Sequence, residues 1–225
     1  MLESEYLDTL ETEFRRNADV AIAEQQMAYM RNQFKCFGLK TPLRRELQKP
    51  FFVKKHLPEK GVMTSLVKEL WGKMQREYQY FGQELAFKYV KVQEKDDIVL
   101  YEYMVTHKSW WDTVDFIAVK LMGTYFKKFP EQRQFYLKKW LESNNIWLQR
   151  SALLFQLKYK SEMDRELLRT TIVSLLDSKE FFINKAIGWV LREYSRTNPK
   201  WVVEFANSIQ LNNLSRREAL RLIKN

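Results

Sequence analysis

The amino-acid sequence predicts an all-helical protein, and three observations carry this prediction. The 225 residues include 6 glycines and 5 prolines, which are few for a chain of this length. Long stretches repeat apolar residues with the 3.6-residue period of an α-helix and are rich in Leu, Glu, Lys, Ala and Met. No run of alternating apolar and polar residues indicates a sheet. The chain is also long enough to bury a core.

Caps and helix breakers divide the chain into short helices with brief connections. Pro42 and Pro199 stand at first-turn positions, Pro130 closes the helix before it, and the expected N-caps include Ser109, Ser178 and Ser215. The expected helices are Leu2–Asn17, Val20–Phe37, Thr41–Leu57, Gly61–Lys73, Arg76–Val92, Lys95–Thr106, Ser109–Phe129, Pro130–Glu142, Asn145–Tyr159, Glu162–Leu176, Lys179–Ser195, Pro199–Ile209 and Ser215–Ile223.

Helix pairs joined by short loops, with no linker or low-complexity stretch, indicate an α-solenoid of HEAT-like antiparallel pairs. The spacing is near the roughly 40 residues per two-helix unit expected for such repeats. No fixed motif recurs, so a large irregular helical bundle is the alternative. We expect one domain over residues 1–225, in which successive helices collect their exposed faces on one concave basic surface.

The charge balance favours a polyanionic partner. The formal net charge is +10, from 38 Lys and Arg against 28 Asp and Glu, which points first to nucleic acid and second to acidic membranes. The lone cysteine, Cys36, excludes an internal disulfide framework. The acidic first residues are unlike a cationic leader, and no stretch approaches the ~18 apolar residues of a membrane span. We therefore expect a soluble cytoplasmic protein, associated with the nucleoid when bound to DNA.

The chain lacks most of the residues that enzymes use for nucleophilic and metal chemistry. His56 and His107 are the two histidines, which makes a zinc site or a Cys–His nucleophile improbable. No glycine-rich phosphate loop is present, so we expect no nucleotide cofactor and no metal. Any reaction must therefore use carboxylates, aromatic rings, Lys and Arg.

A tryptophan and a carboxylate stand together on the expected helix that follows Ser109. Trp110, Val114, Ile117 and Leu121 form its apolar stripe, and Trp111 and Asp115 are neighbours on the flank of that stripe. An aromatic face beside an anionic oxygen suits a planar, positively charged ligand. The structural alternative is an interfacial Trp and an Asp that caps a neighbouring helix.

The helix expected over Lys179–Ser195 also carries a tryptophan outside its apolar stripe, here among basic residues. Ile183, Ile187, Val190 and Tyr194 form its core stripe. On another face lie one large ring and three cations: Trp189, Lys185, Arg192 and Arg196. A ring that stacks on sugars or bases, with cations that hold phosphates, would explain this face. The alternative is that Trp189 contacts the next repeat.

Other charged and aromatic residues have both structural and functional interpretations. Arg150 lies between Ile146 and Leu153 on an apolar face, so it must be paired with a carboxylate or line a wet cleft. The clusters around Lys158 and around Thr41 to Arg45 are basic, and such clusters are usually solvated faces. The stretch with Trp71, Tyr78, Tyr80, Phe81 and Phe87 is interpreted as core.

Three motifs in order resemble the AlkD family of DNA alkylation repair glycosylases, which are built from HEAT-like repeats. The motifs are Lys108-Ser109-Trp110-Trp111-Asp112-Thr113-Val114-Asp115, Asn145-Ile146-Trp147-Leu148-Gln149-Arg150 and Lys185-Ala186-Ile187-Gly188-Trp189-Val190-Leu191-Arg192-Glu193-Tyr194-Ser195. The similarity runs along most of the chain and is thinner toward the N-terminus, where Met27-Ala28-Tyr29-Met30 and the Thr41 to Arg45 segment also match.

The resemblance implies a site and a substrate. Asp115 would be the catalytic carboxylate, and Trp111 and Trp189 would line the lesion site. The DNA backbone would be held by Tyr29, Thr41, Arg45, Arg150, Lys158, Lys185, Arg192 and Arg196. The expected partner is double-stranded DNA with alkylated bases, bound by a monomer without cofactor. A non-catalytic helical-repeat protein that binds DNA or RNA is the competing hypothesis, and a scaffold for acidic proteins is a third.

Overall fold

The computed structural model describes residues 3–223, with side chains from residue 5 onward. Within these residues all regular elements are helices, apart from an isolated bridge between Lys35 and Gln75. The helices pack in pairs, as in an α-solenoid, so the predicted fold class is confirmed. No helix in this range is long and apolar enough to cross a membrane.

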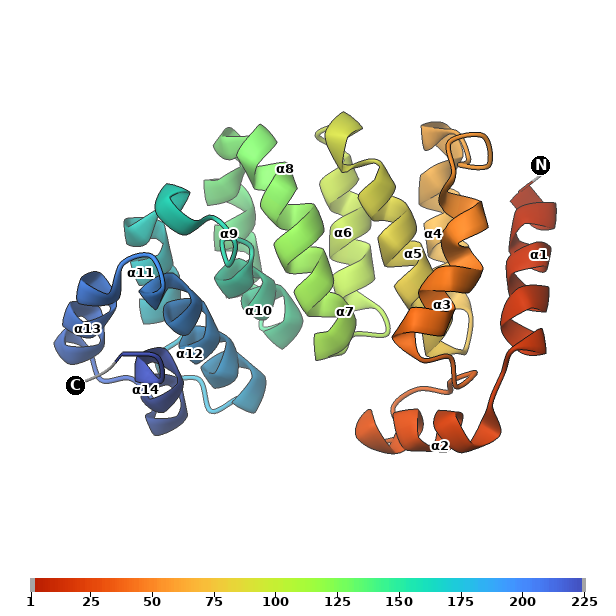
Figure 1. The fold of residues 1–225 in the computed structure, drawn as a ribbon. Coiled ribbons are helices and arrows are strands. Elements are labelled where there is room, and N and C mark those ends of the chain that lie inside the picture. The colour runs from red at the N-terminus through yellow and green to blue at the C-terminus, as the bar shows by residue number, and fades with distance from the viewer. Residues whose placement is uncertain (1–2, 224–225) are drawn as a thin grey trace. The chain divides into compact units, whose positions relative to one another are not determined.

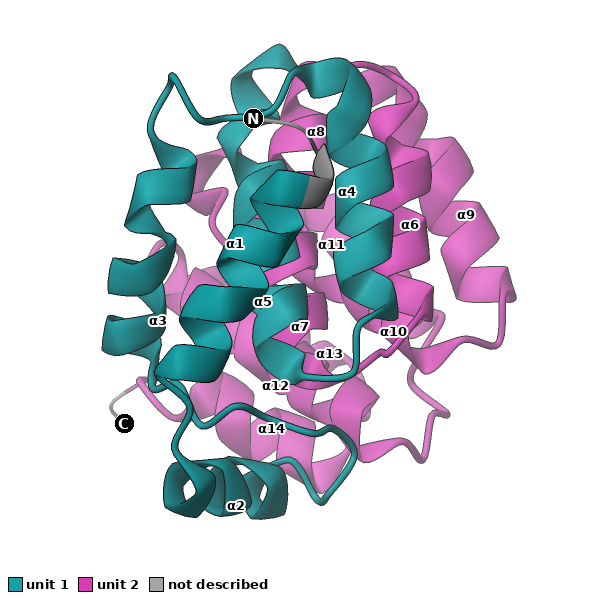
Figure 2. Cartoon of the chain, turned by 90° about the vertical axis from the view of Figure 1, so that its right-hand side faces the viewer, with its two compact units in different colours: residues 1–92 teal, residues 93–225 magenta. Residues whose placement is uncertain are grey.

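The chain divides into two compact units, residues 1–92 (unit 1) and 93–225 (unit 2), which Figure 2 distinguishes by colour. Each unit has its own set of buried apolar side chains. Leu10, Phe14, Val67 and Phe81 are fully buried in unit 1, and so are many side chains of unit 2. A single domain with one concave basic face over residues 1–225 stays a prediction.

Unit 1 contains five α-helices and two 3-10 turns among its described residues. They are α1 (Glu3–Arg16), α2 (Val20–Tyr29), α3 (Thr41–Gln48), η1 (Lys49–Phe52), α4 (Lys60–Gly72), α5 (Arg76–Lys88) and η2 (Val90–Val92). In Figure 1, α2 crosses the ends of the other helices of this unit. The predicted start of the first helix at Leu2 lies outside the described residues.

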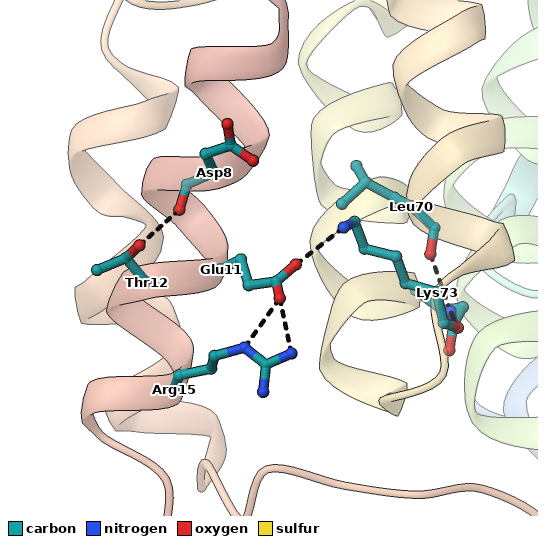
Figure 3. Close-up of polar contacts among 7 residues, drawn as sticks. Asp8, Glu11, Thr12, Arg15, Leu70 and Lys73 are labelled. Carbon is teal, nitrogen blue, oxygen red and sulfur yellow. Dashed lines mark hydrogen bonds and ion pairs between the residues drawn. The ribbon is translucent and has the colours of Figure 1, made fainter.

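An ion pair between Glu11 of α1 and Lys73, the residue that follows α4, connects these two helices at the surface of unit 1. Figure 3 shows the carboxylate of Glu11, which is 2.9 Å from Lys73 Nζ and 2.7 Å from an Arg15 Nη atom. The hydrogen bond from Lys73, followed by that from Arg15, lowers the pKa of Glu11 to about 2. The pair thus stabilises unit 1 in the pH range where Glu11 is ionised.

The segment between α2 and α3 is a loop, and the prediction of a helix from Val20 to Phe37 was wrong past Tyr29. Arg31 and Asn32 have φ values of 54° and 56°, in the left-handed region that ends a helix. Gly38 has a φ of 88°, and a Cβ there would lie 2.0 Å from the carbonyl oxygen of Asp19, so only glycine fits. The buried carboxylate of Glu77 accepts three backbone hydrogen bonds from residues 37–39.

Unit 2 contains the remaining helices. They are α6 (Asp97–Thr106), α7 (Trp111–Phe116), the π-helical segment η3 (Ile117–Met122), α8 (Gly123–Lys128), η4 (Pro130–Gln132), α9 (Arg133–Glu142), α10 (Ile146–Leu154), η5 (Lys160–Glu162), α11 (Arg165–Val173), α12 (Phe181–Ser195), α13 (Pro199–Ser208) and α14 (Asn213–Leu220). Figure 1 shows α7, η3 and α8 as one continuous rod, close to the single helix expected over Ser109–Phe129.

Several predicted boundaries and caps differ from the structure. The helix expected to reach Leu57 ends at Gln48, because Pro50 follows within a 3-10 turn. Ser109 is not an N-cap, since Trp110 holds that position in extended backbone. Ser178 precedes the actual N-cap Glu180, and Ser215 lies inside α14, which Asn212 caps instead. Pro199 does occupy the first turn of α13, as predicted.

Candidate active site

The site begins with α7, which presents Trp111 and Asp115 one turn apart. The predicted stripe is confirmed for Val114, Ile117 and Leu121, which are fully buried. Trp111 is half-buried, and the side chain of Asp115 is 16% exposed. The spacing therefore places a ring and a carboxylate at the edge of the packed face, where both are partly accessible.

Arg150 of α10 holds the Asp115 carboxylate in a two-point ion pair. Arg150 Nε donates to Oδ1 at 2.7 Å, and Nη2 donates to Oδ2 at 2.9 Å. The sequence left two alternatives for Arg150, pairing with a carboxylate or lining a wet cleft. The side chain is 4% exposed and paired, so the first alternative is correct. This geometry fixes the plane and position of the carboxylate.

Two opposing influences act on the proton affinity of Asp115. Burial raises the pKa of this carboxyl above its ordinary value of 3.8, and the hydrogen bonds and charge of Arg150 oppose the rise. The carboxylate offers about four lone-pair directions, and Arg150 occupies one on each oxygen. The others can orient a water molecule or face a developing positive charge.

Arg150 also connects the site to α12. Its Nη1 donates to the carbonyl oxygen of Phe182 at 2.5 Å, so α7, α10 and the first turn of α12 meet at one guanidinium. The rings of Trp110, Trp147 and Phe182 pack against one another, with centroids 5.0 to 5.8 Å apart, and the Arg150 guanidinium lies 5.9 Å from the centroid of the Phe182 ring. The Nε1 atom of Trp110 is buried and has no hydrogen-bond partner within the described part of the chain.

This aromatic cluster was not predicted from the sequence to be part of the site. Local signals existed: Trp147 precedes Arg150 by three residues, and Phe182 precedes Trp189 by seven, so each pair shares one helix face. What brings the three rings together is packing between helices distant in sequence. Trp110 was interpreted as a core residue and is half-buried.

Trp189 is half-buried on α12, and its helix packs as predicted. Ile183, Ile187, Val190 and Tyr194 are all buried, which confirms the core stripe. Phe182 and Trp189 lie on the same side of α12, about 10 Å apart along its axis at 1.5 Å per residue. Trp189 therefore extends the helix face that begins beside Arg150.

The proposed DNA-backbone cations of unit 2 are each paired with a carboxylate. Lys185 and Arg192 contact Glu218, and Lys158 contacts Glu193. Glu193 also pairs with Arg196. The side chains of these cations stay 23% to 62% exposed, so a phosphate can still reach them. Arg150 differs from them, because its burial leaves no such access.

The candidate residues of unit 1 lie on its surface. Tyr29, at the last position of α2, is 71% exposed, and Thr41 begins α3 with an exposed side chain. Arg45 is 62% exposed, and its Nε is 3.5 Å from Glu84. The aromatic stretch interpreted as core is buried at Trp71, Tyr78 and Phe81 but half-buried at Tyr80 and exposed at Phe87. In the described residues no group of three or more His, Cys, Asp or Glu side chains could hold a metal ion.

The comparisons with known proteins agree with this fold. Residues 10–223 match the family model of the DNA alkylation repair enzymes. The chain belongs to this family. A solved structure described as a predicted DNA alkylation repair enzyme from Enterococcus faecalis superimposes with a TM-score of 0.86 at 32% sequence identity, covering 92% of this chain and 97% of that one. A search of the curated proteins found no match.

The family match covers both units and includes every residue singled out for the site. The resemblance that the sequence motifs indicated is therefore confirmed at the level of the family. DNA alkylation repair is the activity for which the family is named, and the likeness to the Enterococcus faecalis structure extends over nearly all of both chains.

Proposed function

We propose that this chain is a DNA glycosylase that hydrolyses the N-glycosidic bond of cationic alkylated purines, of the N3-methyladenine and N7-methylguanine type. The observation that carries the proposal is the Asp115 carboxylate, which Arg150 holds rigidly at a partly accessible position next to Trp111. The family of DNA alkylation repair enzymes supplies the class of substrate.

A single carboxylate suffices for this chemistry because the substrate is already activated. A purine alkylated at N3 or N7 carries a positive charge and leaves as a neutral base, so no general acid has to protonate it. Most glycosidases need a second carboxyl group for that step. The remaining requirement is to stabilise the oxocarbenium character on the deoxyribose and to place the attacking water. The fixed oxygens of Asp115 can perform both tasks.

The partial exposure of two tryptophans supports recognition of a cationic nucleotide. Trp111 and Trp189 are both half-buried, so part of each ring is available to a ligand. A ring face over a cation contributes on the order of 0.5–2 kcal/mol. Selection would therefore depend on the charge of the lesion more than on its base edges, and the damaged nucleotide would be recognised in or near the duplex.

Phosphate contacts would supply most of the affinity for DNA. The proposed contacts are Tyr29, Thr41 and Arg45 of unit 1, and Lys158, Lys185, Arg192 and Arg196 of unit 2. Such binding is largely independent of base sequence and weakens steeply as salt rises. We expect the protein to act as a monomer, without a cofactor.

The test compares a cationic lesion with a neutral one in otherwise identical duplexes. The protein is incubated with DNA that contains N7-methylguanine or uracil, and the released base is quantified by chromatography. Release of N7-methylguanine with little or no release of uracil would support the proposal. Salt-dependent DNA binding without release of either base would favour the non-catalytic helical-repeat protein instead.

A further inference from the structure

Two glutamates each hold two of the proposed DNA-backbone cations. Glu218 of α14 lies 3.0 Å from Lys185 Nζ and also contacts the guanidinium of Arg192. Glu193 of α12 lies 2.6 Å from Lys158 Nζ and 3.5 Å from Arg196 Nε. The four cations proposed on solvent-accessible positions of unit 2 are therefore divided between two acids. We name these groups the Glu218 trio and the Glu193 trio.

The Glu218 trio is built into the packing of α12 against α14. Glu218 is 9% exposed, and a Cβ at Gly188 would lie 2.6 Å from its Cβ, so the two helices approach closely between Lys185 and Arg192. The hydrogen bond from Lys185 and the charges of Lys185, Arg192 and Arg221 outweigh the opposing effect of burial and lower the pKa of Glu218, which favours its ionised form. Both cations are thereby held on the side of α12 next to Trp189.

The Glu193 trio is more open to solvent. The side chains of Lys158 and Arg196 are 56% and 62% exposed, and that of Glu193 is 26% exposed. A cavity of about 300 Å³ lies beside this trio, and its lining includes Glu193, Arg196 and Lys160. A phosphate group therefore has access to the cations of this trio without any change in the backbone.

The formal charge of each trio is +1, because one carboxylate offsets one of its two cations. Lys158, Lys185, Arg192 and Arg196 alone would carry +4, and the two trios together carry +2. The long-range attraction to a polyanion depends on this net charge, and so does the number of counterions released when phosphates bind. The two acids thus reduce the electrostatic attraction to DNA at the proposed phosphate contacts.

We propose that Glu193 and Glu218 limit the affinity of the protein for undamaged duplex, by holding the phosphate-contacting cations in place while weakening their attraction to the DNA backbone. This inference rests on the proposed function, since it concerns the same DNA-binding face. A repair enzyme must dissociate from the large excess of undamaged DNA. Four cations without neighbouring acids would bind phosphates more strongly and slow the dissociation of the enzyme from that DNA.

The experiment compares Glu193→Gln and Glu218→Gln with the wild type and with Glu166→Gln. Glu166 lies exposed on α11 and has no ion pair within residues 5–223, so its variant makes the same charge change without breaking a contact of either trio. Affinity for undamaged duplex is measured between 50 and 200 mM salt, and melting temperatures confirm that each variant is folded. Should Glu218→Gln fold poorly, Glu193→Gln carries the test, because its trio is mostly exposed.

We expect each trio variant to bind undamaged duplex roughly 3- to 10-fold more tightly near physiological salt, with a slope of log K against log salt steeper by about one. Glu166→Gln should stay within about twofold of the wild type. DNA binding by the wild type with no difference between trio variants and Glu166→Gln would overturn this inference. If the wild type itself shows no salt-dependent DNA binding, the proposed function fails as well.

Discussion

Replacing Asp115 by asparagine should impair both stability and catalysis, and the two losses can be separated. Arg150 is 4% exposed and donates to both carboxylate oxygens and to the Phe182 carbonyl. An asparagine retains one acceptor and turns an N–H group toward the guanidinium, so one hydrogen bond is lost and a buried charge is left unbalanced. Such a change costs about 2–4 kcal/mol in the free energy of unfolding.

The catalytic loss should exceed what unfolding explains. Removing one preorganised charge or donor that stabilises a transition state typically costs 10²–10³ in rate. The assay is single-turnover release of N7-methylguanine, normalised to the folded fraction from urea unfolding on the same samples. We expect Asp115→Asn to lose at least about 100-fold per folded molecule.

The double variant Asp115→Asn/Arg150→Met provides the control. It removes both charges of the pair, so its unfolding free energy should return to within about 1–2 kcal/mol of the wild type. Base release should stay low, because the carboxylate is absent. Recovery of excision in the double variant would refute the catalytic assignment of Asp115. An unchanged stability in Asp115→Asn would refute the energetic role of the buried pair.

Three further predictions concern proton binding and packing. Arg150 opposes the rise in the pKa of Asp115 that burial causes, so Arg150→Met should raise that pKa further. The acid limb of the pH–rate profile for base release should then move to higher pH, and a profile identical to that of the wild type would contradict this. Because Trp189 is half-buried, Trp189→Ala should lower the free energy of unfolding by less than the roughly 3–5 kcal/mol that loss of a buried ring costs, and should slow release of N7-methylguanine about tenfold. A large drop in melting temperature with normal turnover per folded molecule would show instead that Trp189 has a packing role only. The pKa of Glu11 is lowered from 4.5 to about 2, so the stabilisation of the folded state by its ion pairs is present above pH 4.5 and is lost as the pH falls toward 2. Glu11→Gln should therefore lower the free energy of unfolding in urea by about 1 kcal/mol at pH 7 and by almost nothing near pH 2.

Features that depend on helical spacing could be predicted from the sequence. Trp111 and Asp115 are one turn apart on α7, and the buried stripe of α12 follows its 3.6-residue period. The burial of Arg150 also followed from its apolar neighbours, and with it the need for a partner. These inferences are local, because a helix fixes which residues share a face.

Features that depend on contacts between distant segments could not be predicted in this way. The partner of Arg150 is 35 residues away, and Glu218 is 26 residues from Arg192, so no spacing rule connects them. An acid from α14 consequently offsets part of the positive charge of Lys185 and Arg192 on the face of α12 expected to be basic. The early end of α2 depends on left-handed backbone at Arg31 and Asn32, which periodicity does not reveal.

The most direct test of the central claim is product analysis after a single turnover on duplex DNA that contains one N7-methylguanine. Hydrolysis of the N-glycosidic bond must yield the free methylated base and an abasic site in equal amounts. The strand should stay intact until it is treated with alkali, because the reaction proposed for Asp115 uses water and leaves the phosphodiester bonds untouched. We predict this one-to-one yield from the wild type and a loss of both products in Asp115→Asn. Full-length strand that still carries the modified base, under conditions where the folded protein is bound to the DNA, would contradict the account.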